Sequence, residues 1–276
     1  MRSNSIRTFL LATLLAAAAA PSFAGIAVSI TIAPPVLPVY TQPVIPGDGY
    51  IWTPGYWAYG LEGYYWVPGT WVLAPRPGLL WTPGYWGFVG GFYGWHGGYW
   101  GPHIGFYGGV NYGFGYGGVG FFGGRWEGGH FAYNTAVANV NTTVIHNTYI
   151  DRTVINNTTV NRTSFNGPNG VQAQPSAQER TAMNEPHVNP TEAQTSHEHA
   201  ASMDRTQLAS VNHGRPANAA MSRPIASANR NPQAAHPQAN TQAKPQANSQ
   251  AKAQPKAQPK AKPAGKPAEH PAEERR

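Results

Sequence analysis

Apolar positions follow three different patterns along the chain. Residues 9–20 form one apolar run that only Thr13 interrupts, residues 50–131 mix aromatic side chains with glycine, and residues 132–165 are rich in Asn and Thr, with an apolar side chain at every fifth position from Ile145 onward. From residue 166 onward, large apolar side chains are almost absent. These changes divide the sequence into five segments, which are residues 1–24, 25–49, 50–131, 132–165 and 166–276.

The first segment has the features of a secretory signal peptide. Arg2 and Arg7 precede the apolar run, and the small residues Ser22 and Ala24 stand before Gly25 in the pattern of a cleavage site. A run of this length measures about 18 Å as a helix, which is too short for a hydrocarbon core of roughly 30 Å. We therefore predict export and cleavage near Gly25. Residues 25–49 then form a Pro-rich connector.

A repeat dominates the third segment, which holds 27 aromatic residues and 25 glycines among 82 residues. Four Trp-x-x-Gly-x-Trp units follow one another in steps of 14, 15 and 14 residues. Their paired tryptophans are Trp52 and Trp57, Trp66 and Trp71, Trp81 and Trp86, and Trp95 and Trp100. The fourth unit departs from the others, because Gly97 stands where they have proline.

Aromatic strands bounded by Gly and Pro clusters predict a mainly β fold, a small antiparallel meander with one unit per strand and hairpin. The Pro-Gly pairs at 54–55, 68–69 and 83–84 fit either of two roles. They are tight turns that pair the flanking tryptophans, or they are bulges inside longer strands.

Two further segments have patterns of their own. Glycines at a spacing of four between residues 105 and 117 resemble a membrane-helix face, but the alternation of glycine there favours an irregular or β-like tract. The Asn/Thr-rich residues 132–165 have a period of five, with Ile145, Ile150 and Ile155 in one phase. That period suits a short β-solenoid, or short strands in an extended arm that packs on the aromatic domain; the arm is favoured.

The last segment, residues 166–276, is rich in Ala, Pro, Gln and Lys, and we predict a long disordered tail. Charge is uneven: residues 25–165 hold four arginines and four acids, whereas all six lysines lie between Lys244 and Lys266. The formal net charge of +7 therefore belongs to the signal segment and the tail. Such a tail is either a solvated spacer or an electrostatic tether to acidic groups.

The four units resemble the bacterial YXWGXW (WXXGXW) repeat family of short exported proteins, over roughly residues 50–100. This resemblance implies a Gram-negative envelope protein, located in the periplasm or at the outer-membrane or extracellular face. It implies no reaction.

The residues give no support for catalysis. Ser29 and Ser164 are the only serines between residues 25 and 165, and the chain has no cysteine. A catalytic triad with a serine or cysteine nucleophile therefore has almost no candidate residues. Asp48 and Glu62 lie in Gly-rich turns, where solvated turn chemistry explains them better than a glycosidase pair does. His96, His103 and His130 lie among glycines and tryptophans, without the spacing or the carboxylate partner of a metal site. We therefore expect no enzyme, no metal and no cofactor.

The tryptophans are the main concentration of binding potential, although packing in the core is the simplest role for them. Aromatic rings that the core leaves exposed would form an interaction surface for a ligand or a partner. Two functions follow: a binding module for envelope or exopolymeric glycan, including peptidoglycan, or a structural protein that self-associates or lies on the outer membrane. The repeats lack interleaved Lys and Arg, which argues against nucleic acid.

Overall fold

A computed structural model describes residues 30–155 and 162–225 of the chain. The expected signal peptide and the lysine-rich end lie outside the described residues. The described part is mainly β, as predicted. Its first eight strands come from the repeats: β1 (Tyr50–Thr53), β2 (Tyr56–Gly60), β3 (Gly63–Val67), β4 (Thr70–Leu73), β5 (Leu80–Thr82), β6 (Tyr85–Val89), β7 (Phe92–His96) and β8 (Tyr99–Gly101).

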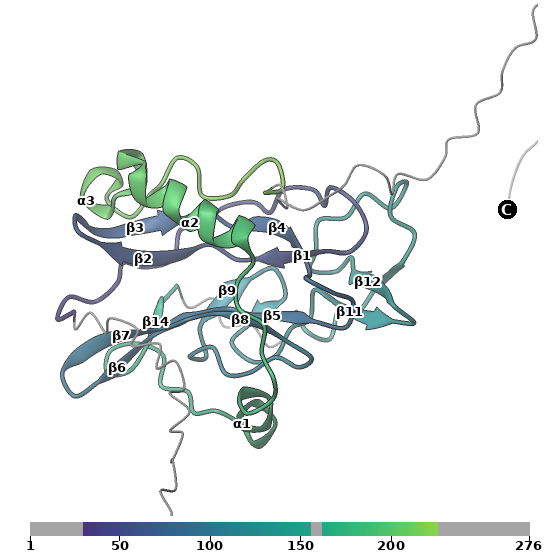
Figure 1. The fold of residues 1–276 in the computed structure, drawn as a ribbon, viewed down its shortest axis with the longest axis horizontal. Helices are drawn as coiled ribbons and strands as arrows, with labels where there is room; N and C mark the ends of the chain where they lie inside the picture. The colour runs from purple at the N-terminus through teal and green to yellow at the C-terminus, as the bar shows by residue number, and fades with distance from the viewer. Residues whose placement is uncertain (1–29, 156–161, 226–276) are drawn as a thin grey trace, which may run out of the picture. The chain divides into compact units, whose positions relative to one another are not determined.

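Two consecutive units form one long hairpin. In hairpin 1, β2 pairs with β3 and β1 pairs with β4, all antiparallel, around an exposed turn at Leu61 and Glu62. In hairpin 2, β6 pairs with β7 and β5 with β8 in the same way. Figure 1 shows the two hairpins as two layers. The predicted meander is therefore built from paired units, with two units per hairpin rather than one.

The Pro-Gly pairs interrupt these long strands. This arrangement is closer to the predicted bulges inside longer strands than to the predicted tight turns. Pro54 and Gly55 separate β1 from β2, while Pro68 and Gly69 separate β3 from β4 directly opposite. Proline has no backbone N–H to give to a strand ladder, and an interruption is where that loss does least harm.

At each interruption, the glycines of the two units lie against each other. A Cβ on Gly69 would lie 3.0 Å from the backbone nitrogen of Gly55 and 2.6 Å from Cζ2 of Trp52. The relation is reciprocal, because a Cβ on Gly55 would collide with the ring of Trp66. In hairpin 2, Gly84 and Gly98 meet in the same way, under the rings of Trp95 and Trp81. The motif glycine is thus required by the tryptophan of the partner unit.

The tryptophans also pair across the strands. Trp52 lies opposite Trp71 and Trp57 opposite Trp66, with ring centroids 5.2 Å apart in both pairs. These edge-to-face contacts are the favoured geometry of aromatic pairs. Hairpin 2 repeats the pairing with the other four repeat tryptophans, whose rings are tilted against each other at centroid distances of 5.3 Å.

The two hairpins enclose the core between them. Trp86 Nε1 donates to the carbonyl of Trp57 at 2.7 Å, which joins one hairpin to the other. The hydroxyl of Tyr116, a fully buried residue, donates to the carbonyl of Trp81 at 2.8 Å and lies 3.3 Å from that of Trp52. Indole and phenol groups therefore fill the core and satisfy backbone carbonyls in it.

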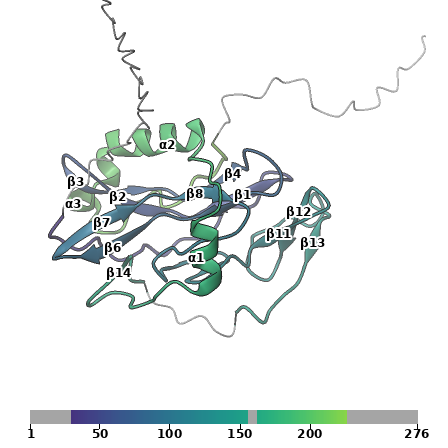
Figure 2. The ribbon, with the colours of Figure 1, turned by 60° about the horizontal axis from the view of Figure 1, so that its bottom comes forward.

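The tract after hairpin 2 is irregular and β-like, as predicted, with β9 (Asn111–Gly113) and β10 (Tyr116–Gly117). In the described residues, no helix is long and apolar enough to cross a membrane. A small sheet follows at one end of the hairpins (Figure 2), made of β11 (Gly124–Glu127), β12 (His130–Asn134) and β13 (Thr148–Tyr149).

The described residues of the segment with a period of five, 132–155 and 162–165, form short strands in an extended arm, the favoured alternative. Its strands β13 and β14 (Phe165–Asn166) add in parallel to β12 and β6. Similar turns recur ten residues apart, at twice the period, because Asn141 and Asp151 each accept hydrogen bonds from the N–H and hydroxyl of the threonine two residues later. Strand β13 lies in the unit between them, so turns and a short strand alternate along this segment.

The predicted disorder from residue 166 onward is wrong for the described part of that segment. Residues 166–225 contain α1 (Ala177–Met183), α2 (Glu192–Met203), the 3-10 helix η1 (Arg205–Gln207) and α3 (Ala209–Asn212). Helices α2 and α3 lie beside hairpin 1, and α1 lies beside hairpin 2 (Figure 1). They need little apolar surface of their own, because capping boxes begin α1 and α2 and the hairpins supply the core.

The neighbouring glycines Gly97 and Gly98 provide a test of the glycine contact. A Cβ on Gly98 would lie 2.5 Å from Trp81 Cζ2 and 2.8 Å from the nitrogen of Gly84, whereas one on Gly97 meets nothing within 4 Å. We expect Gly98→Ala to lower the free energy of unfolding by about 2–3 kcal/mol. Gly97→Ala should change it by less than about 0.5 kcal/mol. Urea denaturation measures both, and equal effects would contradict this account of the motif.

Candidate binding site

Seven of the eight repeat tryptophans belong to the core. Their exposed fractions run from 0% to 7%, and they are Trp52, Trp57, Trp66, Trp71, Trp81, Trp86 and Trp100. Only Trp95 is partly exposed. The repeat tryptophans therefore form no exposed platform of rings, and packing is the role of nearly all of them.

In three of the four units, the second tryptophan also holds a segment outside the hairpins in place. Trp57 Nε1 donates to the carbonyl of Val36 at 3.1 Å, and Trp71 Nε1 donates to that of Pro43 at 2.9 Å. These bonds fix the Pro-rich connector on hairpin 1. Trp100 Nε1 donates to Gln194 Oε1 at 2.8 Å and so holds the first turn of α2.

The two hairpins differ at one equivalent pair of tryptophans, Trp66 and Trp95. Trp66 is fully buried, because residues 219–221 cover it: its Nε1 donates to the carbonyl of Ala219 at 3.0 Å, and the N–H of Gly69 donates to the same carbonyl at 3.1 Å. Trp95 remains partly exposed, and it stacks on Tyr56 of hairpin 1 with centroids 5.0 Å apart and ring planes 17° apart. The fourth unit also differs from the other three at this place. It has Gly97 where they have proline, and the space beside Gly97 is empty.

A cavity of about 520 Å³ lies at this open side, where the interruptions of both hairpins meet. That volume is within the range of small-ligand sites. Its aromatic lining residues are Tyr56, Trp81, Trp95, Tyr99 and Tyr112. Its polar lining residues include Thr53, Thr70, His187, Asn189, Gln194, His197 and Glu198.

The outer wall of the cavity comes from α2 and from the segment before it, residues 187–190. His197 Nε2 donates to the carbonyl of Pro68 at 2.8 Å and ties α2 to hairpin 1. Val188 and Trp100 exchange two backbone hydrogen bonds of 2.8 Å, which tie the preceding segment to hairpin 2. The wall therefore spans both hairpins.

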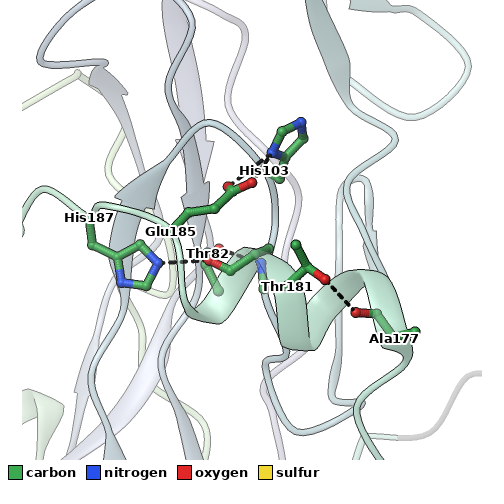
Figure 3. Close-up of polar contacts among 8 residues, drawn as sticks. Thr82, His103, Ala177, Thr181, Glu185 and His187 are labelled. Atoms are coloured by element: carbon green, nitrogen blue, oxygen red, sulfur yellow. Dashed lines mark hydrogen bonds and ion pairs between the residues drawn. The ribbon is translucent and has the colours of Figure 1, made fainter.

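Figure 3 shows how this segment is anchored at the end of α1. The carboxylate of Glu185 lies 2.9 Å from His103 Nδ1, and His187 Nε2 donates to the carbonyl of Ala182 at 2.9 Å. The ring of His187 stacks on Tyr99 with centroids 3.7 Å apart. Histidine 103, which the sequence placed among glycines, thus has a structural partner.

Some polar groups at the cavity have hydrogen-bond partners within the protein, and others do not. The hydroxyl of Tyr112 donates to the carbonyl of Gly84 at 2.6 Å, and burial raises its pKa far above the ordinary value. Within the described residues, the buried hydroxyl of Thr70 has no hydrogen-bond partner. Burial raises the pKa of Tyr56, and the carboxylate of Glu198 raises it further through its charge and a hydrogen bond. The Thr70 hydroxyl is thus an unpaired group behind the cavity surface, whereas Glu198 is partly exposed at the cavity beside Tyr56.

Other candidate residues from the sequence lie elsewhere. Asp48 and Glu62 are in turns, as predicted. His96 stacks on Tyr85 with centroids 4.5 Å apart. Across residues 30–155 and 162–225, no three His, Cys, Asp or Glu side chains group closely enough to hold a metal ion.

Paired tryptophan and glycine contacts define a tandem-repeat protein of mainly β architecture. Residues 47–72 match the family model of the WXXGXW repeat in two copies, which confirms the predicted repeat family. The matched residues coincide with hairpin 1, so the two copies are the two units of one hairpin. Comparison with curated proteins and with solved structures gave no match.

The sequence reasoning missed the wall residues Gln194, His197 and Glu198, because all of them lie in the segment predicted to be disordered. A local signal was present: Ser176 with Glu179, and Thr191 with Gln194, have the spacing of capping boxes. That signal predicts where a helix begins, but not where it packs.

The stability of this wall should depend on pH through His197. Burial lowers the pKa of His197 from 6.5 in the folded protein, so the unfolded chain binds the proton more readily. The free energy of unfolding should therefore fall as the pH drops below about 6.5. His197→Gln should reduce this slope, while the exposed His199 on the same helix serves as the control in His199→Gln. Chemical denaturation between pH 5 and 8 measures the slope, and an unchanged slope in His197→Gln would contradict the prediction.

Proposed function

We propose that this protein is an exported, non-catalytic protein of the cell envelope that binds a glycan in the cavity between its two hairpins. The proposal keeps the binding module predicted from the sequence. The ring that the core leaves partly exposed is Trp95, and the binding surface is accordingly the cavity beside it. Support for export comes from the first 24 residues and from the family resemblance, both in the sequence.

One observation carries the proposal: Trp95 is open to a cavity at the position where the equivalent Trp66 is sealed by its own chain. A ring left open next to Tyr56 and Tyr99 offers flat apolar faces. Sugar rings have apolar C–H faces that stack on such surfaces, and their hydroxyls pair with polar groups at the edges. Asn189 and Glu198, which are exposed and partly exposed at the cavity, supply polar groups of this kind.

Binding is tested by sedimentation with isolated peptidoglycan sacculi and with purified exopolysaccharide. Trp95→Ala should weaken retention at least about tenfold, because the loss of a central aromatic contact has an effect of that size. Gly97→Leu should weaken it as well, since the added side chain enters open space at the cavity.

Phe92→Ala is the matched control, because Phe92 is an exposed aromatic residue of the same strand outside the cavity lining. It should bind like the unaltered protein. Thermal unfolding of each variant separates loss of the site from loss of the fold. Retention that survives both Trp95→Ala and Gly97→Leu would sink the proposal.

The alternative function, self-association or attachment to the outer membrane, has support of its own at the hairpin turns. Leu61, Val89 and Phe92 are exposed there, with Leu61 fully so. If these side chains drive association, Leu61→Ser combined with Val89→Ser should convert an oligomer into a monomer in analytical ultracentrifugation. An unaltered protein that is monomeric and does not sediment with lipid vesicles removes this alternative.

A further inference from the structure

The cavity has an uneven charge. Glu198 is its one carboxylate among the lining residues, which include no lysine or arginine. In the part of the chain that the structure describes, no cationic side chain forms an ion pair with Glu198. A carboxylate without a counter-ion in a cavity attracts a ligand that carries a positive charge.

Both histidines of the wall already have hydrogen-bond partners within the protein. His197 Nε2 donates to the Pro68 carbonyl, and burial lowers the pKa of this histidine, so its ring is uncharged at neutral pH. His187 Nε2 donates to the carbonyl of Ala182, while its ring stacks on Tyr99. Both rings are therefore engaged in holding the wall together.

The aromatic residues that line the cavity also favour a positively charged ligand. The face of an aromatic ring carries partial negative charge, and cations are attracted to it, most strongly to tryptophan. Trp95 and Tyr56 lie stacked at the cavity, and the Glu198 carboxylate is close enough to the Tyr56 hydroxyl to hydrogen-bond with it. One partly exposed tryptophan, one tyrosine and one carboxylate thus meet at one place.

We infer that the cavity selects glycans that carry a protonated amine, with Glu198 as the counter-ion and the Trp95 and Tyr56 rings in contact with the amino sugar. This inference rests on the proposed function and names the class of sugar. Neutral sugars lack the charge that Glu198 requires, and sugar acids are repelled by it.

The test compares two probes that differ only at nitrogen: the tetramer of glucosamine and the tetramer of N-acetylglucosamine. Binding is measured by calorimetry at a pH where the free amine is protonated. The glucosamine tetramer should bind about tenfold more tightly, the combined size of one half-exposed ion pair and one cation–π contact. Glu198→Gln keeps the size and the acceptor for Tyr56 and removes the charge, so it should abolish this preference. Glu192→Gln, on the same helix but outside the cavity lining, should retain it.

The outcomes separate the inference from the proposed function. Equal binding of the two tetramers, tighter binding of the acetylated one, or a preference that survives Glu198→Gln overturns the inference. Sacculi or exopolysaccharide retained through Trp95 without binding of either tetramer overturns it too, while the proposed function stands. If neither tetramer, sacculi nor exopolysaccharide binds, both fail.

Discussion

The structure depends on the close approach of two glycines in opposite strands, each under the indole ring of the other unit. No larger residue permits this approach, because a Cβ at Gly55 or Gly69 would collide with both the facing backbone and a tryptophan ring. The approach brings the paired tryptophans into one layer of the core. It also breaks each strand at a fixed point, and the interruptions of the two hairpins together form the floor of the cavity.

The sequence predicts those parts of the fold whose signals are local. Spacing and composition indicate the repeat, its β structure and the extended arm, since each depends on turns and strands within a few residues. Which strands pair is not local: Trp52 faces Trp71, 19 positions away, rather than Trp57 in its own unit. Only the nested pairing decides which rings are buried, so the sequence left open how the tryptophans divide between core and surface.

The helical segment was missed for a different reason. Its buried apolar side chains are mostly small, such as Ala182, Ala193 and Ala201, and composition alone then indicates a chain without a core. The segment takes its stability from partners far away in sequence, through Trp100 with Gln194 and Pro68 with His197. Sequence motifs do not predict a site that such long-range contacts assemble. The one local sign of its position is Gly97, which replaces the proline of the other units and lines the cavity.

Reciprocal glycine contacts also constrain how such a chain can grow. Each unit supplies the glycine on which its partner's tryptophan lies, so a single added unit would leave one ring uncovered and one glycine unmatched. The smallest addition that keeps every contact is a pair of units, equal to the offset of 29 residues from Trp52 to Trp81. An architecture of this kind therefore grows by whole hairpins, and the two hairpins here differ in that Trp66 is covered by residues 219–221 whereas Trp95 is partly exposed at the cavity.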